Sequence, residues 1–135
     1  MSSIKLSPSP TAEFLQRAIL FSGKSQREIA VGAGFPHPNV ISMMKNGDTK
    51  VPIDRIPALA DTCGVDAAKF VAVAMEEYYP EVWEVLEETL GGLLTPDERE
   101  IVTAYRIAND DASMQISADV AEFLLQFFLL LKARG

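Results

Sequence analysis

The spacing of apolar residues along the chain favours short α-helices. In residues 11–22 apolar side chains recur every three or four positions, as they do on one face of a helix. Comparable stripes follow in most of the remaining sequence. No stretch shows the convincing one-by-one alternation of apolar and polar residues that marks a half-buried strand. The pattern therefore predicts an all-α fold.

Signals for helix ends divide the first part of the chain into five predicted helices. Ser25-Gln26-Arg27-Glu28 is a capping box, in which the serine side chain can accept from a first-turn N–H while the glutamate reaches back. Gly34 can end that helix, and Pro36 and Pro38 disfavour helical geometry in the residues before them. The predicted helices span residues 11–22, 25–33, 38–46, 52–63 and 66–75.

The second half of the chain predicts three further helices. Pro80 precedes an amphipathic stretch that ends at Gly91-Gly92. Thr95-Pro96-Asp97-Glu98 is another capping box, with proline at the first helical position. These helices are expected at residues 80–90, 95–108 and 117–133.

Charge is distributed unevenly between the two halves. Residues 1–75 contain eight Lys and Arg against six Asp and Glu, which is a net charge of +2. Residues 76–135 contain four against thirteen, which is a net charge of −9. An excess of +2 alone does not separate a nucleic-acid-binding surface from an ordinary solvated one. We expect a flexible tail at residues 1–10, a compact domain at 11–75 and an acidic helical region at 76–135.

Several classes of function are disfavoured by what the sequence lacks. A single cysteine, Cys63, allows neither a disulfide framework nor a cysteine metal cluster. The N-terminus has no apolar signal-peptide core, and the apolar run 123–131 is too short to span a bilayer. The acidic pairs Glu76-Glu77 and Glu87-Glu88 lie on charged helix faces without a histidine or a phosphate-binding loop nearby. We expect a cytoplasmic protein that is not an enzyme, with no catalytic residues, cofactor, metal or membrane association.

One segment carries a family resemblance. Residues 25–30, Gly34 and residues 41–47 together resemble the Cro/cI-type (XRE-like) helix-turn-helix of phage and bacterial repressors. The likeness extends to Thr49-Lys50, Pro52, Ile56-Pro57, Leu59-Ala60 and Gly64-Val65, so that it covers about residues 11–75. It implies a five-helix lambda-repressor-like DNA-binding domain, followed by a helical C-terminal region. The recognition helix, about Pro38–Asn46, would enter the major groove.

The spacing between Gly34 and Gly47 is one residue longer than is usual in this family. If the extra residue lies in the turn at 35–37, Ile41 and Met44 face the core and the residues around Asn39 point outward. If the turn is standard, Val40 and Met43 are core instead. We prefer the first register, because the two prolines give the extra residue a natural place.

The resemblance assigns base reading to the outward face of the recognition helix. Asn39 is the first choice because an amide can make two hydrogen bonds to an adenine edge, although Asn is also a favoured helix N-cap. Ser42 could bond either base type. Met43 could contact a thymine methyl or pack in the core. His37 could donate to a base or a phosphate, or serve only as a turn residue.

Phosphate contacts are expected around the same pair of helices. Gln26 stands at the position where the family clamps a phosphate with help from backbone amides. The further candidates are basic or polar side chains near these helices, each of which taken singly could be a solvated surface group. They are Arg27, Lys24, Lys45, Asn46, Thr49 and Lys50.

The last predicted helix presents more apolar surface than one buried stripe requires. Because one recognition helix reads only a few base pairs, helix-turn-helix proteins usually bind two half-sites as dimers. We therefore expect a homodimer interface formed by Phe123, Phe127, Phe128, Leu131 and Trp83. The alternative is an intramolecular core between the late helices and the first domain. The acidic half could also bind a basic protein partner.

Together these patterns predict a sequence-specific DNA-binding transcriptional regulator of the phage-repressor type that binds double-stranded DNA. The alternative is a protein-interaction module on a helix-turn-helix scaffold, antitoxin-like or inhibitor-like, with weak or no DNA binding.

Overall fold

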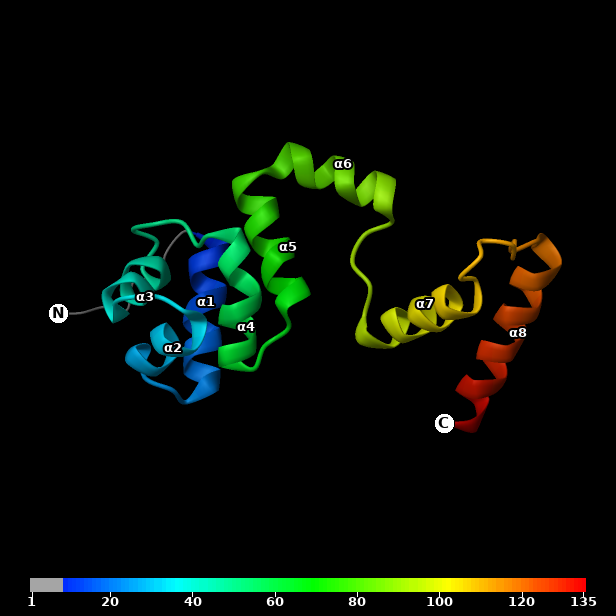
Figure 1. Cartoon of the computed structure of the whole chain (residues 1–135), viewed down its shortest axis with the longest axis horizontal. Helices are drawn as coiled ribbons and strands as arrows, with labels where there is room; N and C mark the ends of the chain where they lie inside the picture. Colours follow the sequence, from blue (N-terminus) through cyan, green and yellow to red (C-terminus); the bar gives the residue numbers. More distant parts are fainter. Residues whose placement is uncertain (1–8) are drawn as a thin grey trace. The chain divides into compact units, whose positions relative to one another are not determined.

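A computed structural model describes residues 9–135 and shows an all-helical chain (Figure 1). Within those residues there are eight α-helices, one short 3₁₀ helix and no strand, which confirms the predicted all-α fold. Most of the predicted tail, residues 1–8, lies outside the described residues. The helices are α1 (Pro10–Ser22), α2 (Gln26–Ala33), α3 (Pro38–Lys45), η1 (Ile53–Arg55), α4 (Ile56–Cys63), α5 (Ala67–Tyr78), α6 (Pro80–Leu90), α7 (Pro96–Ala108) and α8 (Ala118–Arg134).

The chain forms two compact units, one up to Leu93 and one from Leu94 onward. The boundary expected after residue 75 is wrong, because it falls inside α5, which continues to Tyr78. Nothing between residues 75 and 78 ends a helix, and Pro80 is the first residue that cannot continue one. Since α6 packs against α5, its acidic side chains belong to the first unit.

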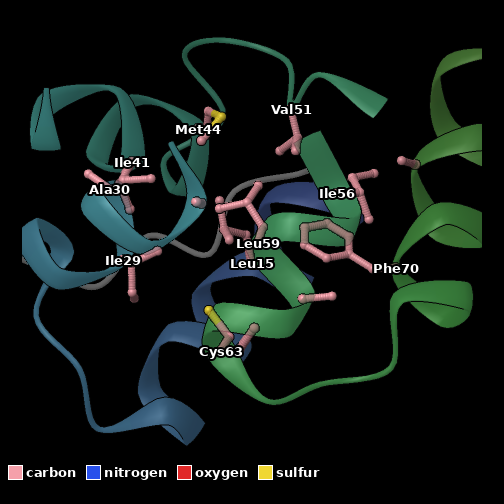
Figure 2. Packing of buried hydrophobic residues seen from close by; sticks show 14 residues of the cluster. Leu15, Ile29, Ala30, Ile41, Met44, Val51, Ile56, Leu59, Cys63 and Phe70 are labelled. Atoms are coloured by element: carbon pink, nitrogen blue, oxygen red, sulfur yellow. The ribbon is translucent and has the colours of Figure 1, made fainter. Parts of the chain in front are cut away.

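The core of the first unit is built from the apolar stripes of α1 to α5 (Figure 2). Leu15 of α1, Leu59 of α4 and Phe70 of α5 are all fully buried. The ring of Phe70 also stacks on Phe14, with 4.7 Å between the ring centroids. The remaining large buried side chains are Ile29, Ile41, Met44, Val51 and Ile56. Five helices thus share one core.

Local capping explains most helix starts. The predicted capping box of α2 is present: Ser25 Oγ accepts from the Glu28 N–H at 3.2 Å, and Glu28 Oε1 accepts from the Ser25 N–H at 3.2 Å. The box at Thr95 and Glu98 opens α7 in the same way. The predicted helix 52–63 begins instead as the 3₁₀ turn η1, because Pro57 has no N–H to bond the carbonyl four residues earlier.

Helices α2 and α4 approach each other closely at Gly32. A Cβ atom on this glycine would lie only 2.7 Å from Cγ2 and 2.9 Å from Oγ1 of Thr62. Those distances are shorter than normal van der Waals contacts, so only glycine fits without movement of α4. The close approach lets α2 pack against α3 on one side and α4 on the other.

The second unit consists of α7 and α8 and has no buried side chain in either helix. In α8, exposed fractions reach 70% at Phe123 and 68% at Leu130. Across residues 9–135 there is no helix with both the length and the apolar character needed to cross a bilayer.

Candidate nucleic-acid interface

A tight turn joins α2 to α3. Gly34 follows α2 with φ +78°, a left-handed conformation that glycine adopts without strain. The N–H of Phe35 then bonds the carbonyl of Ala30 at 2.8 Å, which closes the end of α2. Residues 35–37 lead to Pro38, the first residue of α3, whose fixed φ suits a helix start.

Arg55 of η1 holds this turn from outside the helix pair. Its Nη1 donates to the carbonyl of Gly34 at 3.3 Å, and its guanidinium lies 5.5 Å from the ring centroid of Phe35. In the sequence, Arg55 was recognised only as one of the basic residues of the first half of the chain. No local signal could have found this role, because it depends on packing between residues 21 positions apart.

The register of α3 is the one preferred from the sequence. Ile41 and Met44 are 0% and 1% exposed, whereas Met43 is 42% exposed. Val40 is half-buried at the edge of the core. The extra residue is therefore accommodated in the turn before Pro38, and the alternative register is wrong.

The outward face of α3 carries most of the predicted base-reading residues. Asn39, Met43 and Asn46 are exposed and follow one another at spacings of four and three residues, so they lie along one side of the helix. Ser42 is half-buried beside this line. The N-cap residue is the exposed His37, whose side chain makes no capping bond. Asn39 is therefore not the N-cap, and its amide faces solvent.

The C-terminal end of α3 is fixed by α1 and by its own following loop. Gln16 Nε2 of α1 donates to the carbonyl of Lys45 at 2.6 Å. The carbonyl of Met43 accepts from the N–H of Asp48 at 2.9 Å and from that of Thr49 at 3.4 Å. Both ends of the candidate recognition helix are thereby held against the rest of the unit.

The predicted phosphate-binding residues surround α2 and α3 but differ in what they contact. Arg27 is exposed and Lys45 half-buried, and neither side chain has a hydrogen-bond or ion-pair partner among residues 9–135. Lys24 Nζ donates to the carbonyl of Thr62 at 2.7 Å. Lys50 Nζ lies 5.2 Å from the ring centroid of Tyr78. Gln26, the first residue of α2, is half-buried, and Thr49 is exposed.

The end of α5 fastens the loop that follows α3. The hydroxyl oxygen of Tyr78 accepts from the N–H of Val51 at 2.9 Å. This positions the segment that carries Thr49 and Lys50, two of the candidate phosphate contacts. The sequence did not predict this contact of Tyr78 with the loop, because the helix was expected to end before Tyr78.

Glu77 fastens the start of α1 in a similar way. Its Oε1 accepts from the Thr11 N–H and from the Ser9 hydroxyl, each at 2.8 Å. Desolvation by burial acts to raise the pKa of Glu77, but the hydrogen bonds from Thr11 and Ser9, with the positive charge of Lys50, outweigh it. The pKa of Glu77 is therefore lowered from its ordinary value.

Within the first unit, positive and negative charges are concentrated in different segments. Residues 24–55 contain five Lys and Arg against three Asp and Glu, a net charge of +2. Residues 76–90 contain six Glu and no basic residue, a net charge of −6. The acidic segment includes α6, whose packing partner is α5 rather than α2 or α3. The positive excess therefore stays on the segment that contains the candidate interface.

The predicted dimerisation residues are divided between the two units. Trp83 is half-buried on α6 and lines an open hollow whose other residues are mostly acidic: Glu76, Glu84, Glu87 and Glu88, with Pro80. On α8, Phe123 is 70%, Phe127 48%, Phe128 39% and Leu131 43% exposed. No side chain of α6, α7 or α8 is fully buried. The intramolecular core that the sequence left as an alternative stays a prediction.

Comparisons of the chain with protein-family models, with curated proteins and with solved structures found no match. Within residues 9–135, no group of three or more His, Cys, Asp or Glu side chains is arranged to hold a metal ion.

Proposed function

We propose that this protein is a sequence-specific DNA-binding transcriptional regulator of the phage-repressor type. In this proposal α1 to α5 form a five-helix lambda-repressor-like domain, and α3 enters the major groove. The observation that carries the proposal is the two-sided character of α3. Its inner side is buried through Ile41 and Met44, while Asn39, Met43 and Asn46 line its solvent-exposed side.

The outward side chains have the chemistry needed to read base edges. An exposed asparagine amide can bond N6 and N7 of adenine at once, which gives about 1–3 kcal/mol of discrimination against another base. Met43 offers an apolar group for a thymine methyl, and Ser42 a hydroxyl that serves either base type. Asn39 lies in the first turn of α3, and in helix-turn-helix proteins the first residues of the recognition helix reach the bases.

Affinity would come from contacts to the phosphate backbone. Arg27 lies in the first turn of α2, where free backbone N–H groups also favour an anion. Lys45 and Lys50 lie at the end of α3 and in the loop beyond it. Lys24 contributes less in this account, since its ammonium group is already bonded to the end of α4. Contacts of this kind set affinity and orientation but carry no sequence information.

The regulator is proposed to act as a homodimer on two half-sites. One short recognition helix contacts only a few base pairs, and pairing two copies multiplies both affinity and specificity. The apolar side chains of α8 supply a surface for such pairing.

Three alanine variants of the full chain test the proposal through binding to a selected duplex and to unrelated duplexes. Asn39→Ala should lower affinity for the selected duplex about tenfold or more and change the preferred bases, with unrelated duplexes unaffected. Arg27→Ala should weaken binding to all duplexes. It should also reduce the slope of log affinity against log salt concentration by about one, because one phosphate contact is lost. Lys69→Ala is the matched control, since it removes an exposed positive charge from α5, away from α3.

The proposal fails if Asn39→Ala binds every duplex as the wild type does, or if the wild type shows no preference among duplexes. Circular dichroism of each variant establishes that the fold is retained.

A second candidate function is favoured by the acidic surface of α6. The hollow around Trp83 combines an aromatic ring with four glutamates, which suits a basic protein segment. In that case the helix-turn-helix scaffold serves as a protein-interaction module, antitoxin-like or inhibitor-like. The double variant Glu84→Gln/Glu87→Gln would then weaken capture of the protein partner, whereas the DNA-binding proposal predicts that this variant binds DNA normally.

A further inference from the structure

Helix α8 is apolar over most of its circumference, and the second unit leaves that surface exposed. Twelve of its seventeen residues are apolar, and none of them is buried. A helix of this composition is stable in water only when other helices cover it. The second unit does not itself provide such cover, because no side chain of α7 or α8 is buried.

The exposure pattern shows which side of α8 is most open. Phe123 and Leu130 are 70% and 68% exposed, whereas Leu124 and Phe128 are 38% and 39% exposed. Phe123 and Leu130 belong to a line of residues spaced three or four positions apart, which lie along one side of a helix. The members of this α8 stripe are Asp119, Phe123, Phe127, Leu130 and Arg134.

The α8 stripe has an acidic residue at its amino end, apolar residues in its middle and a basic residue at its carboxyl end. Read from its carboxyl end, the stripe has nearly the same apolar positions, but a basic residue stands where the acidic one stood and an acidic residue where the basic one stood. Two α8 helices packed antiparallel place Asp119 of each copy opposite Arg134 of the other. They also place Phe123 opposite Leu130, with Phe127 close to the two-fold axis. A parallel pair instead places each charge opposite its own copy, where like charges repel.

We propose that the occupant of the α8 stripe is α8 of a second copy of this chain, packed antiparallel. The charge pattern favours a second copy over an unrelated partner, because the stripe is complementary to itself. The opposed helix dipoles of an antiparallel pair act in the same direction as the side-chain charges. This inference deepens the proposed dimeric regulator by naming its pairing surface and orientation, and it rests on that function only for the role of the dimer.

Charge exchange within the stripe tests the proposal, with sedimentation equilibrium of the full chain in the absence of DNA. Arg134→Glu makes both ends of the stripe acidic, and Asp119→Arg makes both ends basic. Each single variant should raise the dimer dissociation constant about tenfold, since two symmetry-related attractions become repulsions. The double variant Asp119→Arg/Arg134→Glu restores opposite charges and should return the constant to near the wild-type value.

Lys132→Glu provides the matched control. It makes the same charge change as Arg134→Glu, but position 132 lies two residues away and on nearly the opposite side of the helix. Its dimer dissociation constant should remain near that of the wild type. Circular dichroism of each variant reports whether the helices are retained.

Three results would overturn the pairing: a monomeric wild type, single variants that dimerise as the wild type does, or a double variant that is not restored. Because these measurements contain no DNA, their failure is distinct from failure of the proposed function. An intact dimer that binds no DNA would remove the regulatory function and leave the α8 pairing in place.

Discussion

At the residue scale, the two adjacent methionines of α3 provide a direct check of its orientation. Met44 is 1% exposed and Met43 is 42% exposed, although both are methionines of the same helix. Met44→Ala should lower the free energy of unfolding by about 2–4 kcal/mol, because it leaves a cavity in the shared core. Met43→Ala should change it by less than about 0.5 kcal/mol. Urea denaturation measures both, and equal costs would contradict the assigned register.

The Glu77 contacts at the start of α1 predict a pH dependence of stability. The folded-state pKa of Glu77 is lowered from its ordinary value of 4.5. Its stabilising effect is therefore fully present above the unfolded-state pKa and is lost as the pH falls through the folded-state pKa. Glu77→Gln should lower the free energy of unfolding by about 1 kcal/mol at pH 7. The difference from the wild type should disappear as the pH falls below 4.5.

Urea denaturation between pH 7 and pH 3 measures this difference. The control is Glu76→Gln, since Glu76 is a neighbouring exposed glutamate whose side chain has no hydrogen-bond or ion-pair partner among residues 9–135. A cost of Glu77→Gln that stayed constant or grew toward low pH would contradict the hydrogen-bonded carboxylate.

At the scale of elements, the helix ends were predictable because their signals are local. The serine and threonine caps at Ser25 and Thr95 and the stops at Gly34 and Gly64 act within one turn of the chain. The register of α3 also followed from local information, namely the two prolines that lengthen the turn. The sequence could not show the contacts that orient α2 and α3, which join residues 21 to 38 positions apart.

The end of α5 illustrates the same limit. Periodicity alone placed the end of the helix at about Met75, whereas the helix continues to Tyr78. The added residues include Glu77 and Tyr78, which bond α1 and the loop after α3. Their partners come from distant parts of the sequence, so their roles depend on the packing of the complete unit.

The crossing of α2 and α4 gives a prediction that belongs to a pair of elements. Gly32→Ala adds a Cβ 2.7 Å from Cγ2 of Thr62, and rotation of Thr62 brings little relief because Oγ1 lies at 2.9 Å. We expect a loss of about 1–2 kcal/mol in the free energy of unfolding, even though alanine is favoured over glycine in a helix by about 1 kcal/mol.

A double-mutant cycle isolates this contact. In a Thr62→Ala background the clash is absent, and Gly32→Ala should then stabilise the protein by about 0.5–1 kcal/mol. Thermal or urea denaturation of the four chains measures the coupling. An equal cost of Gly32→Ala in both backgrounds would show that the close approach is not the reason for glycine at this position.

At the scale of the whole molecule, the distribution of charge is compatible with the proposed DNA binding, although the chain has a net charge of −7. The carboxylates are concentrated after residue 75, whereas the segment that contains α2 and α3 has a small positive excess. The acidic elements would be repelled by the phosphate backbone, which favours approach through the α2–α3 side. In the proposed function, the net charge restricts the orientation in which DNA binds rather than excluding binding.

The division into two units also separates the two proposed tasks. The unit up to Leu93 has its own buried core, and the unit from Leu94 has exposed apolar helices and no core. This arrangement fits a first unit that reads DNA and a second unit that becomes buried by pairing with another copy. The sequence indicated the apolar excess of α8, but the side of the helix that stays open became visible only from the exposure of individual side chains.

The most direct test of the central claim is selection of a randomised duplex library on the purified full chain at near-physiological salt, followed by sequencing. We predict enrichment of one motif repeated with two-fold symmetry, in which Asn39→Ala changes the preference at one base pair of each half-site. Recovery of no sequence above background by a folded, dimeric wild-type protein would contradict the account.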